Sequence, residues 1–191
     1  MKSLLIIFLF LLSGCSFFDS DKATPFYITH VFEVNRETVY EMWINPRSFS
    51  KWLGPNNAVM SFMEIDISEG GSSLWSVTTP DGEVRYGRLN YKKLLAPHTI
   101  VYSQYFTDKE GKFIKAPFSP TYPNELLTTV TLTEDEPNRT LVSVKWEVYG
   151  SSSRIERRTF NEMKPQMNQD WEESFERLES LLEARKIQPA K

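Results

Sequence analysis

The residues best spaced for acid–base chemistry are two carboxylates in one expected strand. Glu64 and Asp66 lie two positions apart, so their side chains share one face of a strand, a spacing that suits a general acid and a general base. Three hydroxyls at 151–153 have no histidine or acid at a recognisable spacing, and a helix cap explains them. We therefore find no convincing catalytic constellation and assign no catalytic residue.

Other functional classes have little support in the composition. The chain has 191 residues, a net charge of −3 and scattered lysines and arginines, which argues against nucleic-acid binding. His30 and His98 are the only histidines and Cys15 is the only cysteine, so no cluster has the spacing of metal ligands. We expect no metal and no other cofactor, and one globular domain.

Cys15 is nevertheless a candidate for modification. It follows Lys2 and an unbroken apolar run at 4–12, which is too short to cross a bilayer as a mature helix. The residues Leu-Ser-Gly-Cys at 12–15 resemble the lipobox of bacterial lipoproteins, where the segment before the cysteine is removed and the thiol carries a diacylglycerol. The alternatives are a plain secretory signal, with an incidental cysteine, or an N-terminal anchor that is never cut.

This resemblance predicts where the protein resides. Residues 1–14 would be a lipoprotein signal peptide and 15–24 a tether, with the acyl chains on Cys15 holding the protein at a membrane of the bacterial cell envelope. Ser16 after the cysteine, in place of an aspartate, favours the outer membrane facing the periplasm where a cell has one.

The element that must organise the domain is a long helix near the C-terminus. Six apolar residues recur at steps of four, four, four, three and four, which places one stripe on a single helical face: Met163, Met167, Trp171, Phe175, Leu178 and Leu182. Ser153 and Glu156 have the spacing of a capping box, so a helix should begin there. Pro165 predicts either a kink or a short helix followed by the long one.

The remaining chain predicts an α+β domain. We expect a first strand at 26–34, short helices at 36–43 and 49–53, and then strands at 59–67, 73–79, 84–95, 99–106, 126–133 and 141–148, the last two joined across 134–140. A curved antiparallel sheet of six to seven strands would then wrap around the long helix, with one face buried.

An ordered set of short motifs from Phe26 to Leu182 is similar to the homologues of the activator of heat-shock protein 90 ATPase. The clearest are Val-Tyr-Glu-Met-Trp at 39–43, Lys-Trp-Leu-Gly-Pro at 51–55, Glu-Ile-Asp at 64–66, Gly-Gly at 70–71, Pro-Asp-Gly at 80–82 and Leu-Thr-Thr-Val-Thr at 127–131. The family belongs to the START-like, or SRPBCC, superfamily with its helix-grip fold. The resemblance assigns this domain to 25–186 and gives Glu64 and Asp66 a role in bracing the Gly-Gly turn.

The resemblance implies a cavity between the curved sheet and the long helix. Cavities of this kind are apolar with a few convergent polar groups. Six side chains are candidates for contact with a ligand: Trp75, Tyr102, Gln104, Trp146, Met167 and Trp171. Each could instead be a packing residue.

The expected function is the binding of a small hydrophobic or amphipathic ligand by a membrane-anchored domain, without chemistry. Two alternatives stay open. The resemblance also permits a cyclase or hydratase acting in the same cavity, which would need a titratable group there with a perturbed pKa. It also permits a cofactor of the chaperone, although a signal peptide argues against a cytosolic partner; the sequence identifies no protein partner.

Overall fold

The computed structural model describes residues 22–55 and 57–187, so Cys15 and the predicted signal peptide lie outside the described part of the chain. The elements follow in the order β1 (Phe26–Phe32), α1 (Arg36–Ile44), α2 (Pro46–Trp52), β2 (Val59–Glu64), β3 (Ser72–Thr78), β4 (Val84–Leu95), β5 (Thr99–Thr107), β6 (Leu126–Glu136), β7 (Arg139–Val148), α3 (Arg154–Glu162) and α4 (Lys164–Ile187). No helix of these ranges has the length and apolar character that crossing a bilayer requires.

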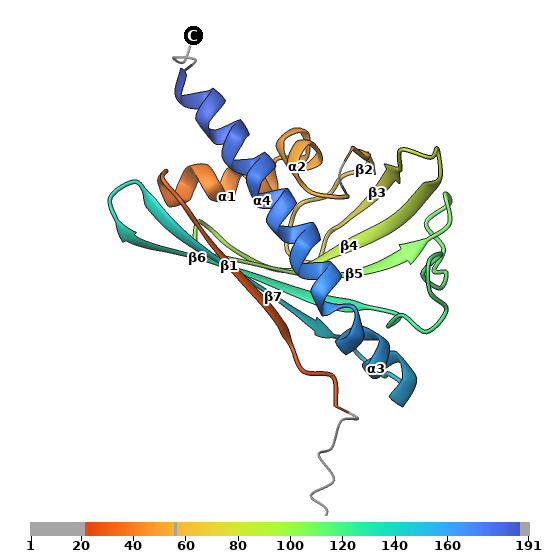
Figure 1. The fold of residues 1–191 in the computed structure, drawn as a ribbon. Coiled ribbons are helices and arrows are strands. Elements are labelled where there is room, and N and C mark those ends of the chain that lie inside the picture. The colour runs from red at the N-terminus through yellow and green to blue at the C-terminus, as the bar shows by residue number, and fades with distance from the viewer. Residues whose placement is uncertain (1–21, 56, 188–191) are drawn as a thin grey trace, which may run out of the picture.

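The sheet is antiparallel and has seven strands in the order β1-β7-β6-β5-β4-β3-β2. It curves around α4, which crosses its inner face, while α1 and α2 cover one end (Figure 1). This is the predicted helix-grip arrangement, and it confirms the α+β class. Five members of the stripe are buried along α4: Met167, Trp171, Phe175, Leu178 and Leu182. Burying five such side chains contributes on the order of 10 kcal/mol, which is an upper bound.

Local capping explains where the helices begin and end. The side chain of Asn45 accepts hydrogen bonds from the backbone N–H of Arg47 (3.0 Å) and Ser48 (3.3 Å), so the residue that ends α1 also starts α2. The capping box of Ser153 and Glu156 begins α3 as predicted. Pro165 then separates α3 from α4 and occupies the first turn of α4, where its missing N–H costs little.

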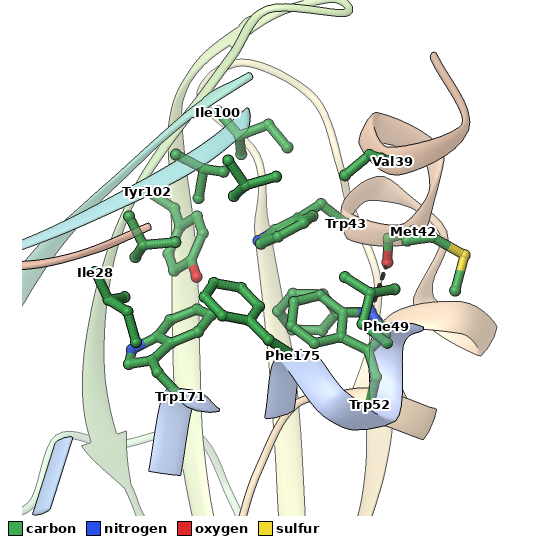
Figure 2. Packing of buried hydrophobic residues seen from close by; sticks show 14 of the residues in the cluster. Ile28, Val39, Met42, Trp43, Phe49, Trp52, Ile100, Tyr102, Trp171 and Phe175 are labelled. Carbon is green, nitrogen blue, oxygen red and sulfur yellow. Dashed lines mark hydrogen bonds between the residues drawn. The ribbon is translucent and has the colours of Figure 1, made fainter. Parts of the chain in front are cut away.

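A dense core fills the half of the inner face under α1 and α2. Figure 2 shows Tyr102 of β5, Trp43 of α1 and Phe175 of α4 converging there, each almost fully buried. Beside them, the indole N–H of Trp52 donates to the Met42 carbonyl at 3.1 Å and fixes α2 on α1. This half of the sheet therefore has no space for a ligand.

Two expectations about the strands were wrong. The loop predicted at 134–140 is a tight turn, because β6 and β7 continue to Glu136 and Arg139 and Asn138 takes a left-handed conformation (φ 61°). The strand expected to reach residue 67 ends at Glu64 after a register shift. Asp66 therefore does not share a strand face with Glu64.

Candidate functional site

A cavity of about 260 Å³ lies between α4 and the half of the sheet that the core leaves uncovered. Strands β2 to β7, the segment after α2, the loop 108–124 and α4 all contribute to its wall. The apolar part of the wall consists mainly of Phe49, Leu53, Pro55, Met60, Trp75, Val77, Leu89, Phe106, Phe118, Tyr122, Leu126, Trp146, Met163, Met167 and Trp171. A space lined in this way suits an apolar molecule or the apolar part of one.

One side of the cavity is an aromatic wall. Phe106 of β5 lies at its centre, with ring centroids 5.9 Å from Trp75, 5.4 Å from Phe118 and 6.3 Å from Tyr122. Phe118 and Tyr122 also meet edge to face at 5.1 Å. These edge-to-face contacts hold the rings without filling the space in front of them.

Trp75 keeps its place because a glycine lies beneath it. Gly87 of β4 pairs directly with Trp75 of β3, and a Cβ atom at Gly87 would lie 2.1 Å from Cζ2 of the indole ring. Only the absence of a side chain at Gly87 leaves room for the ring at this position.

The inner side of the cavity is made by two further indoles. Trp146 of β7 and Trp171 of α4 meet edge to face at 5.6 Å. Their Nε1 atoms are buried and have no hydrogen-bond partner among the described residues. Burying a donor without a partner costs free energy, so these two indoles lower the stability of the inner wall.

Polar groups occur singly in the wall. The amide of Gln104 and the hydroxyl of Tyr122 face the cavity, and neither hydrogen-bonds to any residue that the structure describes. Burial raises the pKa of Tyr122, with a smaller contribution from the nearby Asp170 carboxylate, so the phenol stays protonated and can donate. Asp170 itself accepts from Gln166 at 2.9 Å.

Among the described residues, Arg85 is the only basic residue in the wall of the cavity. Its guanidinium donates to Glu83 at 2.7 Å and lies 5.5 Å from the centroid of the Phe118 ring. Its Nε atom is buried without a partner in the described part of the chain.

A clamp at one edge of the cavity joins α4 to the segment after α2. Arg177 donates from Nε to the Trp52 carbonyl at 3.1 Å, and its Nη2 donates to the carbonyl of Gly54 and, at 3.1 Å, to the Ser174 hydroxyl. Leu53, which follows α2, is thereby held against the cavity.

The structure places five of the six candidate residues in this wall: Trp75, Gln104, Trp146, Met167 and Trp171. Tyr102 is not among them, because its side chain is 2% exposed and packs in the dense core. That these five residues contact a ligand remains a prediction. Sequence reasoning missed the loop residues Phe118 and Tyr122, for which the only signal was an aromatic pair between prolines in a long loop.

The other candidates for chemistry lie apart from the cavity. Glu64 pairs with Arg88 at 3.0 Å, and Asp66 accepts from Ser68 at 2.7 Å. His30 lies 3.8 Å from Glu179 and contacts the ring of Phe175. In the described ranges 22–55 and 57–187, no group of three or more His, Cys, Asp or Glu could hold a metal ion.

The family model described as Activator of Hsp90 ATPase homolog 1-like protein matches residues 33–183. A solved protein from Arthrobacter aurescens is 25% identical, with a TM-score of 0.70 over 85% of this chain and 87% of its own. Protein Ms6760 from Mycobacterium smegmatis is 19% identical (TM-score 0.67, 84% and 91% covered). The AHSA1 protein from Silicibacter pomeroyi is 12% identical (TM-score 0.65, 85% and 99% covered). A search of curated proteins finds none that matches.

Proposed function

Because the chain belongs to the family of Activator of Hsp90 ATPase homolog 1-like proteins, and its START-like fold indicates a ligand-binding domain, we propose that it binds one small hydrophobic or amphipathic molecule between the sheet and α4. The observation that carries this proposal is the cavity of about 260 Å³ with its aromatic wall. Typical ligand pockets measure about 300–1,000 Å³, so this volume favours a small molecule.

The polar groups of the wall support an amphipathic ligand. Its apolar part would lie against the rings of Trp75, Trp146 and Trp171. Its polar end would pair with Gln104 and Tyr122, whose amide and hydroxyl have no hydrogen-bond partner among the described residues. Such pairing would orient the ligand and select for it, since an analogue without that polar end would leave them unpaired.

We further propose that acyl chains on Cys15 anchor this domain to a membrane of the bacterial cell envelope. This part rests on the sequence at residues 12–15. Native mass spectrometry of protein extracted from its own membranes in mild detergent tests both parts of the proposal. The expected mass is that of a chain starting at Cys15 with acyl chains and one retained small molecule. An acylated protein that is always empty would contradict the binding role, and an unprocessed chain would contradict the anchor.

A matched pair of variants locates the binding site. Val77 lines the cavity and is 8% exposed, whereas Val84 lies in the same β3–β4 hairpin, is 43% exposed and is not part of the cavity wall. With anilinonaphthalene sulfonate as an apolar probe, Val77→Phe should lower fluorescence enhancement and affinity at least fivefold, and Val84→Phe should leave both unchanged. Equal effects of the two variants would refute the assigned site.

The two alternatives from the sequence remain alternatives. A cyclase or hydratase would need a titratable group in the cavity with a perturbed pKa, and Tyr122 is such a group; however, its raised pKa keeps it protonated, and its hydroxyl hydrogen-bonds to no described residue that could take or supply the proton. No contact described above favours a chaperone cofactor, so we propose neither.

A further inference from the structure

One end of the molecule combines the exit of the N-terminal tether with an apolar and basic surface. We define the basic end as α3, the loop 108–124, Lys164 and the segment 22–24. Lys115 of the loop forms an ion pair with Glu156 of α3 at 2.5 Å, and Thr159 of α3 hydrogen-bonds to Thr121 of the loop at 2.9 Å. The loop and α3 are therefore one continuous surface.

The tether emerges from this end. Asn161 of α3 donates to the Lys22 carbonyl at 3.0 Å and accepts from the Thr24 N–H at 3.2 Å, while the Lys164 ammonium donates to the Thr24 hydroxyl at 2.5 Å. Cys15 is seven residues before Lys22, and seven residues span at most about 25 Å. An acyl chain on Cys15 would therefore hold the basic end within that distance of the bilayer surface.

The charge of the basic end is opposite to that of the whole chain. Residues 108–124 and 153–164 include seven lysines or arginines and four aspartates or glutamates, in a chain of net charge −3. The Lys109 and Arg158 side chains are each 70% exposed, and each also pairs with a glutamate of the same segment, Lys109 with Glu110 at 3.6 Å and Arg158 with Glu162 at 3.2 Å. A surface of this sign is attracted to anionic headgroups by about 1 kcal/mol per basic residue, which is about fivefold in affinity.

Three large apolar side chains of the basic end are exposed. Ile155 of α3 is 50% exposed, and Phe113 and Phe118 of the loop are 45% and 41% exposed. Apolar groups among basic side chains are the composition of a surface that inserts shallowly into the boundary between headgroups and acyl chains. Phe113 and Phe118 keep these exposed fractions although each ring also packs on β5, against Tyr105 and Phe106 respectively.

The cavity lies directly behind this surface. Phe118 and Tyr122 of the loop line the cavity, and so do Met163 and Gln166 next to α3. We propose that the basic end docks on the anionic surface of the membrane that carries the anchor, so that a ligand passes between bilayer and cavity without crossing bulk water. This inference rests on the proposed anchor and ligand, and it adds the orientation of the domain and the source of the ligand.

Environment-sensitive probes at two matched positions test the docking. Ile155 and Leu95 are both 50% exposed, but Leu95 is near the start of β5, at the opposite end of that strand from the loop 108–124. Full-length acylated protein, with Ile155→Cys or Leu95→Cys labelled by nitrobenzoxadiazole, is reconstituted into phosphatidylcholine vesicles with or without 30% phosphatidylglycerol. Docking predicts a blue shift and quenching by spin-labelled lipid for the probe at 155 alone, and only with the anionic lipid.

Charge variants supply the second measurement. Lys109→Gln with Lys112→Gln should lower the ratio of docked to undocked protein roughly twentyfold, whereas Lys92→Gln with Lys93→Gln, exposed on β4, should not change it.

The outcomes separate this inference from the proposed function. An acylated, ligand-bearing protein whose probe at 155 stays in water would overturn the docking alone. A shift at 155 in a protein whose cavity is always empty would support the docking and contradict the binding role. Equal shifts at 155 and 95 would also overturn the docking, because they would show no preferred orientation.

Discussion

Gly87 is the position where a single methyl group should disturb the cavity most. An alanine Cβ there would lie 2.1 Å from Cζ2 of Trp75, whereas ordinary contacts begin at 3.4 Å. The ring must therefore move by about 1.3 Å, and Phe106, whose ring lies 5.9 Å away on the other side of β4, restricts the movement. The open direction leads into the cavity. Gly87→Ala should cost about 1–3 kcal/mol of the free energy of unfolding, as overpacking does, and should weaken binding of the apolar probe.

The assay is urea denaturation followed by tryptophan fluorescence, run as a double-mutant cycle with Trp75→Ala. If the clash with the indole causes the loss, Gly87→Ala should cost less than about 0.5 kcal/mol once the ring is gone, because alanine is otherwise no worse than glycine in a strand. A loss of 1–3 kcal/mol that persists without Trp75 would refute the reasoning.

Three further predictions concern stability. Arg177→Ala should cost about 2–3 kcal/mol, because the carbonyls at the end of α2 lose a charged donor, and Arg177→Lys should recover only part of it in the same urea assay. Trp52→Phe should cost about 1–3 kcal/mol, because the buried carbonyl of Met42 loses its indole donor. The pKa of Glu156 is held below its usual value, first by Lys115 and then by the Ser153 backbone. The ionised Glu156 carboxylate should therefore contribute fully to the free energy of unfolding above about pH 4.5, and this contribution should be lost as the pH falls below that value. In Glu156→Gln, the free energy of unfolding should depend less on pH over the same range.

A different result would contradict each of these three predictions. An unchanged urea midpoint in Arg177→Ala would show that water replaces the guanidinium at both carbonyls. Equal stability of Trp52→Phe and the parent would mean that the hydrogen bond is exchanged for solvent without cost. A pH profile of Glu156→Gln parallel to the parent's would contradict the assigned role of the Lys115 pair.

The fold could be predicted because its patterns are local and repeated. The apolar stripe on α4 and the capping box of α3 can be recognised from the spacing of residue types alone, and each predicts one element correctly. The hairpin of β6 and β7 was predicted, but its turn is shorter than expected because Asn138 takes a left-handed conformation. The end of β2 was missed because a register shift depends on the pairing with the neighbouring strand, which the sequence of β2 alone does not show.

The site was less predictable because alternation along a strand indicates the face of a side chain and not its place along the sheet. Tyr102 and Gln104 are on one face of β5 as predicted, but α1 and α4 cover Tyr102, whereas Gln104 lies where the cover ends. The loop residues Phe118 and Tyr122 reach the cavity through tertiary contacts with Phe106, for which the sequence has no periodic signal.

The division of the inner face into a filled half and a hollow half has a consequence for how such a chain can change over evolution. Substitutions around Trp43 and Phe175 remove packed volume and cost stability at once. Substitutions at Val77 or Gln104 mainly alter the shape of an existing space. Selection can therefore exchange the bound molecule while the scaffold persists, so related chains that share this architecture need not share a ligand.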